Sequence, residues 1–266
     1  MRTLWIIEPG TDGGRLRTYL RAMRIDEATD AATSTPAPGS HRPRHVGLIM
    51  DGNRRWARSQ GLADVSLGHQ AGAEHLSNVL AWLSTRGIEH ASVYVLSAVN
   101  IRRRGALELR TLFRLIENVI PARVLAAEQW CLHISGDLDL LPKRTRVALM
   151  DAVETTRDRP RHLTLAIGYD AHADILGAVR SAVVDLPVGD VDALSVDLIS
   201  QHLPGGPAKE IDLIIRTGGD NRASGFFPWQ STSAELHVAS CSWPDFSEHD
   251  LDSALAHYDA VISANT

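Results

Sequence analysis

The sequence predicts an α/β protein built on a mostly parallel β-sheet that helices cover on both faces. Short runs rich in Val, Ile and Leu, which are typical of buried strands, alternate along the chain with segments whose apolar residues recur every three or four positions. This alternation indicates successive β-α-β units, in which each helix leads back to the start of another parallel strand. Apolar residues make up 44% and charged residues 22% of the 266 residues, as in an ordinary globular protein.

The individual elements follow in order from this patterning. The segments with strand character are residues 45–50, 88–96, 130–134, 162–167, 212–215 and 235–239. The segments with helical periodicity are residues 76–83, 109–120, 141–156, 174–184 and 195–202, and a last one that starts at 247. Gly87 is expected to stop the first of these helices, and Ser247 followed by Asp250 is close to a capping box for the last.

Residues 1–44 are expected to be an N-terminal extension, largely disordered, ahead of a catalytic domain over residues 45–266. Residues 26–44 are rich in Ala, Thr, Ser and Pro and nearly lack large apolar side chains. Such a segment buries too little surface to offset the entropy that it loses on ordering. The roughly 220 residues that follow suit one domain with a substantial core.

Composition excludes several classes of protein. Lys and Arg total 27 against 32 for Asp and Glu, a net charge of −5, whereas a general nucleic-acid-binding protein is basic. No run approaches the roughly 20 apolar residues of a transmembrane helix. Two cysteines are too few for a disulfide framework or a cysteine-rich metal site. A cytoplasmic enzyme is therefore expected, although composition does not name its reaction.

Polar motifs follow the strands, where ligands of parallel sheets bind. After the first strand stands Asp51-Gly52-Asn53-Arg54-Arg55-Trp56. A carboxylate at a strand end is well placed for a divalent metal, and the glycine and the next backbone N–H groups suit a phosphate at a helix start. By itself, however, this segment is more often an ordinary turn followed by a solvated basic helix.

Two further motifs are weak when each is taken alone. His69 lies in Gly68-His69-Gln70-Ala71-Gly72 at an expected helix start, where it is a proton donor, a phosphate contact or simply a helix-terminus histidine. Ser97-Ala98-Val99-Asn100 runs into three arginines at 102–104, directly after a strand. That charge run fits anion binding and a solvated surface equally well.

The segment after the fifth strand carries the most information. It reads Ile215-Arg216-Thr217-Gly218-Gly219-Asp220-Asn221-Arg222-Ala223-Ser224. Arginine forks match phosphate oxygens and glycines let the backbone approach, so this segment suits a diphosphate clamp. No GxxxxGK[ST], HExxH, GxGxxG or DDxxD motif occurs, and the twelve histidines show no metal-ligand spacing.

Taken together and in order, these segments resemble the cis-prenyltransferase family (undecaprenyl diphosphate synthase-like). The family pattern of HxxxIMDGNGRWA, GHxxG, SxENW, IRTxGExRxSxFxxWQ, a glutamate and WPDF stands here as HVGLIMDGNRRWA, GHQAG, SAVNI, IRTGGDNRASGFFPWQ, Glu235 and WPDF. The resemblance covers the chain from about His45 to its end. It implies a single domain with a six-stranded, mostly parallel sheet, and a homodimer.

The resemblance also implies roles for individual residues. Those expected to carry the chemistry are Asp51, Asn53, His69, Ser97 and Asn100. Those expected to bind the two diphosphate substrates are Gly52, Arg54, Arg55, Trp56, Arg103, Arg216, Arg222 and Ser224. Those expected to hold Mg²⁺ are Asp51 and Glu235.

Departures from the family pattern favour an unusual reaction. The glutamate and tryptophan of SxENW are replaced by Val99 and Ile101, whereas Asn100 remains. A small subgroup that also lacks this glutamate joins two allylic diphosphates head-to-middle, as in lavandulyl and cyclolavandulyl diphosphate synthesis. The sequence is therefore expected to encode such an irregular enzyme, with dimethylallyl diphosphate as acceptor and dimethylallyl or geranyl diphosphate as donor.

Two alternatives stay open. One is an ordinary short-chain cis-prenyltransferase that makes a Z-configured 1′-4 product with isopentenyl diphosphate. The other is a non-catalytic subunit of a heteromeric prenyltransferase, which the lost motif residues favour and the retained ones oppose.

Overall fold

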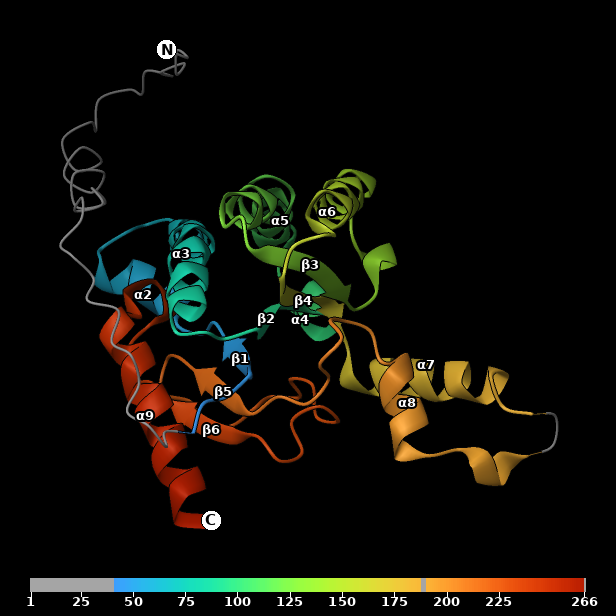
Figure 1. Ribbon diagram of the computed structural model, residues 1–266. Helices are drawn as coiled ribbons and strands as arrows, with labels where there is room; N and C mark the ends of the chain where they lie inside the picture. The colour runs from blue at the N-terminus through green and yellow to red at the C-terminus, as the bar shows by residue number, and fades with distance from the viewer. Residues whose placement is uncertain (1–40, 188–189, 266) are drawn as a thin grey trace. The chain divides into compact units, whose positions relative to one another are not determined.

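The computed structural model describes residues 41–187 and 190–265, and it confirms the predicted α/β fold (Figure 1). A six-stranded sheet has the order β3-β4-β2-β1-β5-β6, and all neighbouring strands in it are parallel. Its strands are β1 (His45–Ile49), β2 (His90–Ser97), β3 (Trp130–Ser135), β4 (Arg161–Tyr169), β5 (Leu213–Arg216) and β6 (Glu235–Val238). Each strand overlaps the segment predicted for it.

Helices connect the strands, and six of them overlap segments whose periodicity predicts a helix. They are α2 (Asn53–Ser59), α3 (Ser66–Thr85), α4 (Ala98–Arg103), α5 (Ala106–Ala126), α6 (Lys143–Thr156), α7 (Ala171–Val184), α8 (Val196–His202) and α9 (Glu248–Asn265). Gly87 adopts a φ of 75° just after α3, a left-handed conformation that suits the residue following a helix. The capping box at α9 is confirmed, since Ser247 Oγ accepts from Asp250 N at 3.2 Å and Asp250 Oδ2 accepts from Ser247 N at 2.8 Å.

The larger core lies on the face of the sheet that α3, α5 and α6 cover (Figure 1). Strand side chains alternate between the two faces, so Leu48, Val93 and Leu165 point into this core and pack against Leu80 and Leu149 of the helices. The helices α7 and α8 lie on the opposite side of the sheet in Figure 1 and share a small cluster of their own. The sheet is therefore covered on both faces, as predicted.

The opposite face of the sheet carries an aromatic cluster below the strand ends. Tyr169, Phe226 and Phe227 pack there with Ile49 and Ile214. Phe226 and Phe227 belong to the segment that follows β5, so their burial in this cluster holds in place the motif at 216–224 that precedes them. The predicted disorder of the N-terminal extension falls almost entirely on residues outside the described part of the chain, so the proposed domain boundary near residue 45 stays a prediction.

His45 is a buried histidine whose two ring nitrogens are both hydrogen-bonded in the neutral form. Its Nδ1–H donates to the Glu210 carbonyl at 2.8 Å, and its Nε2 accepts from Ser92 Oγ at 2.9 Å. Burial lowers the pKa of His45 from 6.5 to about 4. Below about pH 6.5 the imidazole is therefore protonated in the unfolded chain but stays neutral in the folded chain. The folded state consequently loses stability as the pH drops from about 6.5 to 4.

Because of His45, we expect the free energy of unfolding to fall by about 3 kcal/mol as the pH drops through this range. Urea denaturation at pH 7 and at pH 4 measures the difference. His45→Gln, which cannot take up the proton, should lessen the dependence, whereas the exposed His249→Gln should leave it unchanged. Equal slopes for wild type and His45→Gln would contradict this account.

Candidate active site

Two cavities adjoin each other at the carboxyl ends of β1, β2 and β5, and Asp51 lines both. Their volumes are about 740 Å³ and 690 Å³. We call the first the arginine-rich cavity, since it is lined by Arg54, Arg55, Arg58, Arg103 and Arg104. We call the second the strand-end cavity; its polar walls include Ser97, Asn100, Arg216, Arg222 and Ser224. The sequence motifs therefore meet at one edge of the sheet.

Asp51 is fixed by the backbone at the junction of the two cavities. Its own N–H donates to Thr217 Oγ1 at 3.0 Å, and its Oδ1 accepts from Gly52 N at 2.7 Å. Gly52 has a φ of 99°, and a Cβ there would meet Ser242 within 3 Å, so only glycine fits this turn. The turn thus aims the Asp51 carboxylate away from the sheet.

Arg216 organises the polar groups around Asp51. It ends β5 opposite Ile49 of β1 and is only 4% exposed. Its Nη2 donates to Asp51 Oδ2 and to Asp220 Oδ2, each at 2.9 Å, and its Nη1 donates to Ser224 Oγ at 2.7 Å. A planar guanidinium suits this task because its fork holds several acceptors in fixed directions.

Asp220, not Glu235, is the second carboxylate beside Asp51. Because both aspartates accept from the same Arg216 nitrogen, their oxygens lie close together. Glu235 is the first residue of β6 and is in register with Leu213 of β5. Leu213 precedes Arg216 by three residues, which places Glu235 roughly 10 Å from Arg216 toward the amino end of the sheet. Glu235 thus lies away from Asp51 within one chain, and its expected role as a Mg²⁺ ligand stays a prediction.

The arginine-rich cavity contains a carboxylate that the sequence analysis did not single out. Glu108, in the first turn of α5, pairs with Arg104 four residues earlier, and its Oε1 lies 3.7 Å from Arg54 Nη1 and 3.2 Å from His69 Nε2. Opposite charges four residues apart were the available signal. The contact with His69 is not readable from the sequence, because those residues are 39 positions apart.

His69 is partly buried between these charges. Burial lowers its pKa, and the Arg104 cation lowers the pKa further, whereas Glu108 opposes the shift. The imidazole is thus neutral near pH 7 and uses its Nε2–H to donate to Glu108. The ring lines both cavities, so the predicted place of His69 in the site agrees with the structure.

Asn53 and Trp56 are placed by packing. Asn53 Nδ2 donates to the Met50 carbonyl at 3.0 Å, and its Oδ1 lies where a Cβ on Gly72 would come within 2.3 Å. The glycines of the GHQAG motif therefore let α3 approach α2. Trp56 is buried and its Nε1 donates to Asp245 Oδ1 at 2.6 Å. Trp56 lines neither cavity, so its expected contact with substrate is corrected to a supporting position.

Ser97 and Asn100 come from the junction between β2 and α4. Ser97 Oγ caps α4 by accepting from Asn100 N at 3.0 Å. Val99, which stands where the family has glutamate, is 42% exposed and lines the strand-end cavity. This wall is accordingly apolar at the point where the family pattern places a negative charge.

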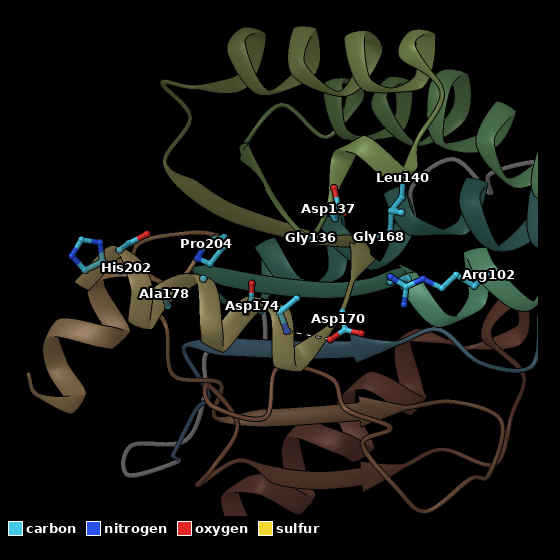
Figure 2. A pocket seen from close by; sticks show the side chains of 14 residues that line it. Arg102, Gly136, Asp137, Leu140, Gly168, Asp170, Asp174, Ala178, His202 and Pro204 are labelled. Carbon is cyan, nitrogen blue, oxygen red and sulfur yellow. Dashed lines mark hydrogen bonds between the residues drawn. The ribbon is translucent and has the colours of Figure 1, made fainter. Parts of the chain in front are cut away.

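A third cavity, of about 510 Å³, lies beside the site (Figure 2). Figure 2 shows Asp170 and Asp174 of the α7 region along one side of it and Gly136 and Asp137 along another. Asp170 also lines the strand-end cavity, so the two hollows are neighbours. It is less basic than the arginine-rich cavity, since Arg102 is the arginine in its lining.

Cations at the ends of three parallel strands, with paired aspartates between two cavities, suit the binding of diphosphate-type anions. Comparison with known proteins makes this specific. The sequence model of a family described as "Putative undecaprenyl diphosphate synthase" matches residues 49–262. The chain belongs to this family, the cis-prenyltransferases, and is a prenyltransferase.

Individual relatives cover most of the chain. It is 42% identical to an isoprenyl transferase of Streptomyces fradiae, over 82% of this chain and 88% of the relative. It is 38% identical to a (2Z,6E)-farnesyl diphosphate synthase of Mycobacterium tuberculosis, over 84% and 88%. A lavandulyl diphosphate synthase from Lavandula x intermedia, solved with dimethylallyl diphosphate, superimposes with a TM-score of 0.75 at 30% identity, over 82% and 95%.

The helices of the described residues include none that is long and apolar enough to cross a membrane.

Proposed function

We propose that this chain is a short-chain cis-prenyltransferase that joins an allylic diphosphate to isopentenyl diphosphate and forms a Z-configured 1′-4 product. The observation that carries the proposal is the pair of cavities, both bordered by Asp51, Arg103 and Arg104. Each cavity also has arginines that the other lacks: the first has Arg54, Arg55 and Arg58, and the second has Arg216 and Arg222. The name of the mycobacterial relative, a (2Z,6E)-farnesyl diphosphate synthase at 38% identity, supports this reaction over the irregular one.

The arginine-rich cavity suits the allylic diphosphate. Arg54, Arg55 and Arg103 line it, and Gly218 leaves room for Arg55, whose Nη2 lies where a Cβ on Gly218 would come within 2.4 Å. Preorganised cations of this kind stabilise the charge that develops on a departing diphosphate. The allylic group would extend into the strand-end cavity, whose apolar walls include Leu96, Val99 and Leu112.

The strand-end cavity suits the acceptor. Arg222 and Ser224 line it, and Arg216 donates a hydrogen bond to the Ser224 hydroxyl. Fixing the acceptor diphosphate there orients its double bond toward C1 of the allylic group, and that orientation decides which bond forms. The acceptor then loses a proton, which the departing diphosphate can accept.

Asp51 and Asp220 fit a divalent cation such as Mg²⁺. Both carboxylates reach one nitrogen of Arg216, and hard oxygen donors of this type are the ligands that Mg²⁺ prefers. Mg²⁺ bound there would offset negative charge on the allylic diphosphate as the C–O bond breaks. The cytoplasmic location and the homodimer stay predictions.

Irregular head-to-middle coupling is the second candidate. Val99 in place of a glutamate favours it, because an apolar wall changes how the acceptor is held and deprotonated. The structural similarity to a lavandulyl diphosphate synthase supports it as well. The two candidates differ in one substrate, and that difference can be assayed.

We expect the purified chain, with Mg²⁺, to convert geranyl diphosphate only when isopentenyl diphosphate is present. Mass spectrometry and NMR should identify a Z-configured 1′-4 product. Consumption of dimethylallyl diphosphate alone, with a branched product, would replace this proposal with head-to-middle coupling. Inactivity with every pair of substrates, relieved by an added partner protein, would instead indicate a non-catalytic subunit. The Asp51→Asn chain provides the blank.

A further inference from the structure

A row of histidine and cysteine side chains crosses the sheet at its amino end, away from the strand ends that carry Asp51. His45 of β1 is in register with His90 of β2, His90 with His162 of β4, and His162 with Cys131 of β3. Register partners in a parallel sheet point to the same face, and His133, two residues after Cys131, points there too. The prenyl transfer described above uses none of these residues.

Three members of this row lie close enough to share one ion. Cys131 Sγ and one ring nitrogen each of His133 and His162 lie within 4.8 Å of one another. His133 Nε2 and His162 Nδ1 are 3.0 Å apart. Two imidazole nitrogens that bind one tetrahedral Zn²⁺ lie about 3.3 Å apart, so the rings need only a small shift to become joint ligands.

The surroundings keep both imidazoles neutral, as metal ligation requires. Burial is the main cause that lowers the pKa of His133 to about 4, and it also lowers the pKa of His162. Lys209 is the nearby cation that acts on His133. An ion could enter from a cavity of about 680 Å³ that is lined by His90 and His162.

We infer that Cys131, His133 and His162 form a binding site for a borderline-soft divalent transition metal such as Zn²⁺. One thiolate and two imidazoles are ligands that zinc prefers and Mg²⁺ avoids. On binding, the Cys131 thiol releases its proton to solvent and gives up its contact with the Arg157 carbonyl. The imidazole that donates between the two rings moves its proton to its other ring nitrogen, so that both rings stay neutral and the ion takes the place of their hydrogen bond. A water completes the tetrahedron. The site ties the edge strand β3 to β4 and takes no part in the reaction.

Cobalt substitution tests the site directly. The full chain, reduced and saturated with Mg²⁺ to occupy oxygen-ligand sites, is titrated with Co²⁺. We expect a near-ultraviolet thiolate-to-cobalt charge-transfer band that Zn²⁺ abolishes. Cys131→Ser should lack the band, whereas Cys241→Ser, at the other free cysteine, should keep it. A missing band in wild type, or an unchanged band in Cys131→Ser, would overturn the inference.

A second variant covers the case in which Cys131→Ser fails to fold. His162→Gln removes one ligand at a half-buried position, and its metal-free melting curve reports folding. Isothermal titration should show Zn²⁺ affinity weaker by at least about tenfold, since even residues outside the ligand shell cost that much. His257→Gln, from the separate His237–His257 ring pair, is the matched control. Equal affinities in His162→Gln and wild type would refute the site.

Discussion

Replacing Asp51 with Asn is expected to lower kcat by about 10³-fold while leaving the fold intact. Removing one preorganised electrostatic group from a reacting centre costs about two to three orders of magnitude, and Asp51 also carries the charge that would hold Mg²⁺. Asparagine keeps the shape of the side chain, and its amide oxygen can still accept from Gly52 N. The loss should therefore appear mainly in turnover, with a smaller fall in melting temperature because the amide removes the Asp51 Oδ2 acceptor of Arg216 Nη2.

Single-turnover assays with geranyl and isopentenyl diphosphates measure this effect without interference from product release. Asp158→Asn is the control, because Asp158 is exposed and its side chain lies outside both cavities. A kcat for Asp51→Asn within about tenfold of wild type would show that the carboxylate does not carry the charge assigned to it.

Replacing Arg216 with Lys is expected to lower kcat/KM by about 10²-fold, and the melting temperature should fall as well. The guanidinium donates to Asp51, Asp220 and Ser224 at once, and an ammonium on a shorter reach cannot reproduce that fork. The negative charges of Asp51 and Asp220 would then be less well balanced by positive charge at a partly buried position. Arginine-to-lysine is thus a severe change here although the charge is kept.

Steady-state kinetics with each substrate varied in turn, together with melting curves, check this prediction. Arg157→Lys is the matched control, since Arg157 is exposed and pairs only with Glu154 and Asp158 among the described residues. An unchanged kcat/KM in Arg216→Lys would mean that the network around Asp51 tolerates rearrangement, contrary to the organising role given to Arg216.

Much of this site follows from the order of motifs along the chain. Asp51 and Arg216 are 165 positions apart, yet Asp51 comes just after the apolar strand β1 and Arg216 is the last residue of the apolar strand β5. In a parallel sheet all carboxyl ends share one edge, so the sequence already predicts that these residues gather there. The structure adds that β1 and β5 are neighbours, which brings the two side chains into direct contact.

Other features of the site depend on facts that strand patterning does not contain. Glu235 was expected to hold Mg²⁺, as Asp51 was, but it begins its strand, so it lies away from Asp51 within one chain. Trp56 follows the diphosphate motif in sequence, but the turn of α2 sends it into the core. Glu108 enters the site because α5 packs against α3, a tertiary contact that neither segment reveals alone.

The net charge of −5 also has a different meaning once the fold is known. The arginines that follow the strands gather around two cavities, so the chain presents a basic site in spite of an acidic average. A field of that sign concentrates diphosphates near the strand ends, although the composition by itself indicates only a net acidic chain.

The central claim is that two diphosphates bind on either side of Asp51. A crystal structure with Mg²⁺, isopentenyl diphosphate and the unreactive thiolo analogue of geranyl diphosphate tests it most directly. The account predicts the analogue's diphosphate among Arg54, Arg55 and Arg103, and the acceptor's diphosphate at Arg222 and Ser224, with Asp51 between them. A single shared diphosphate site, or binding at the amino end of the sheet near Glu235, would contradict it.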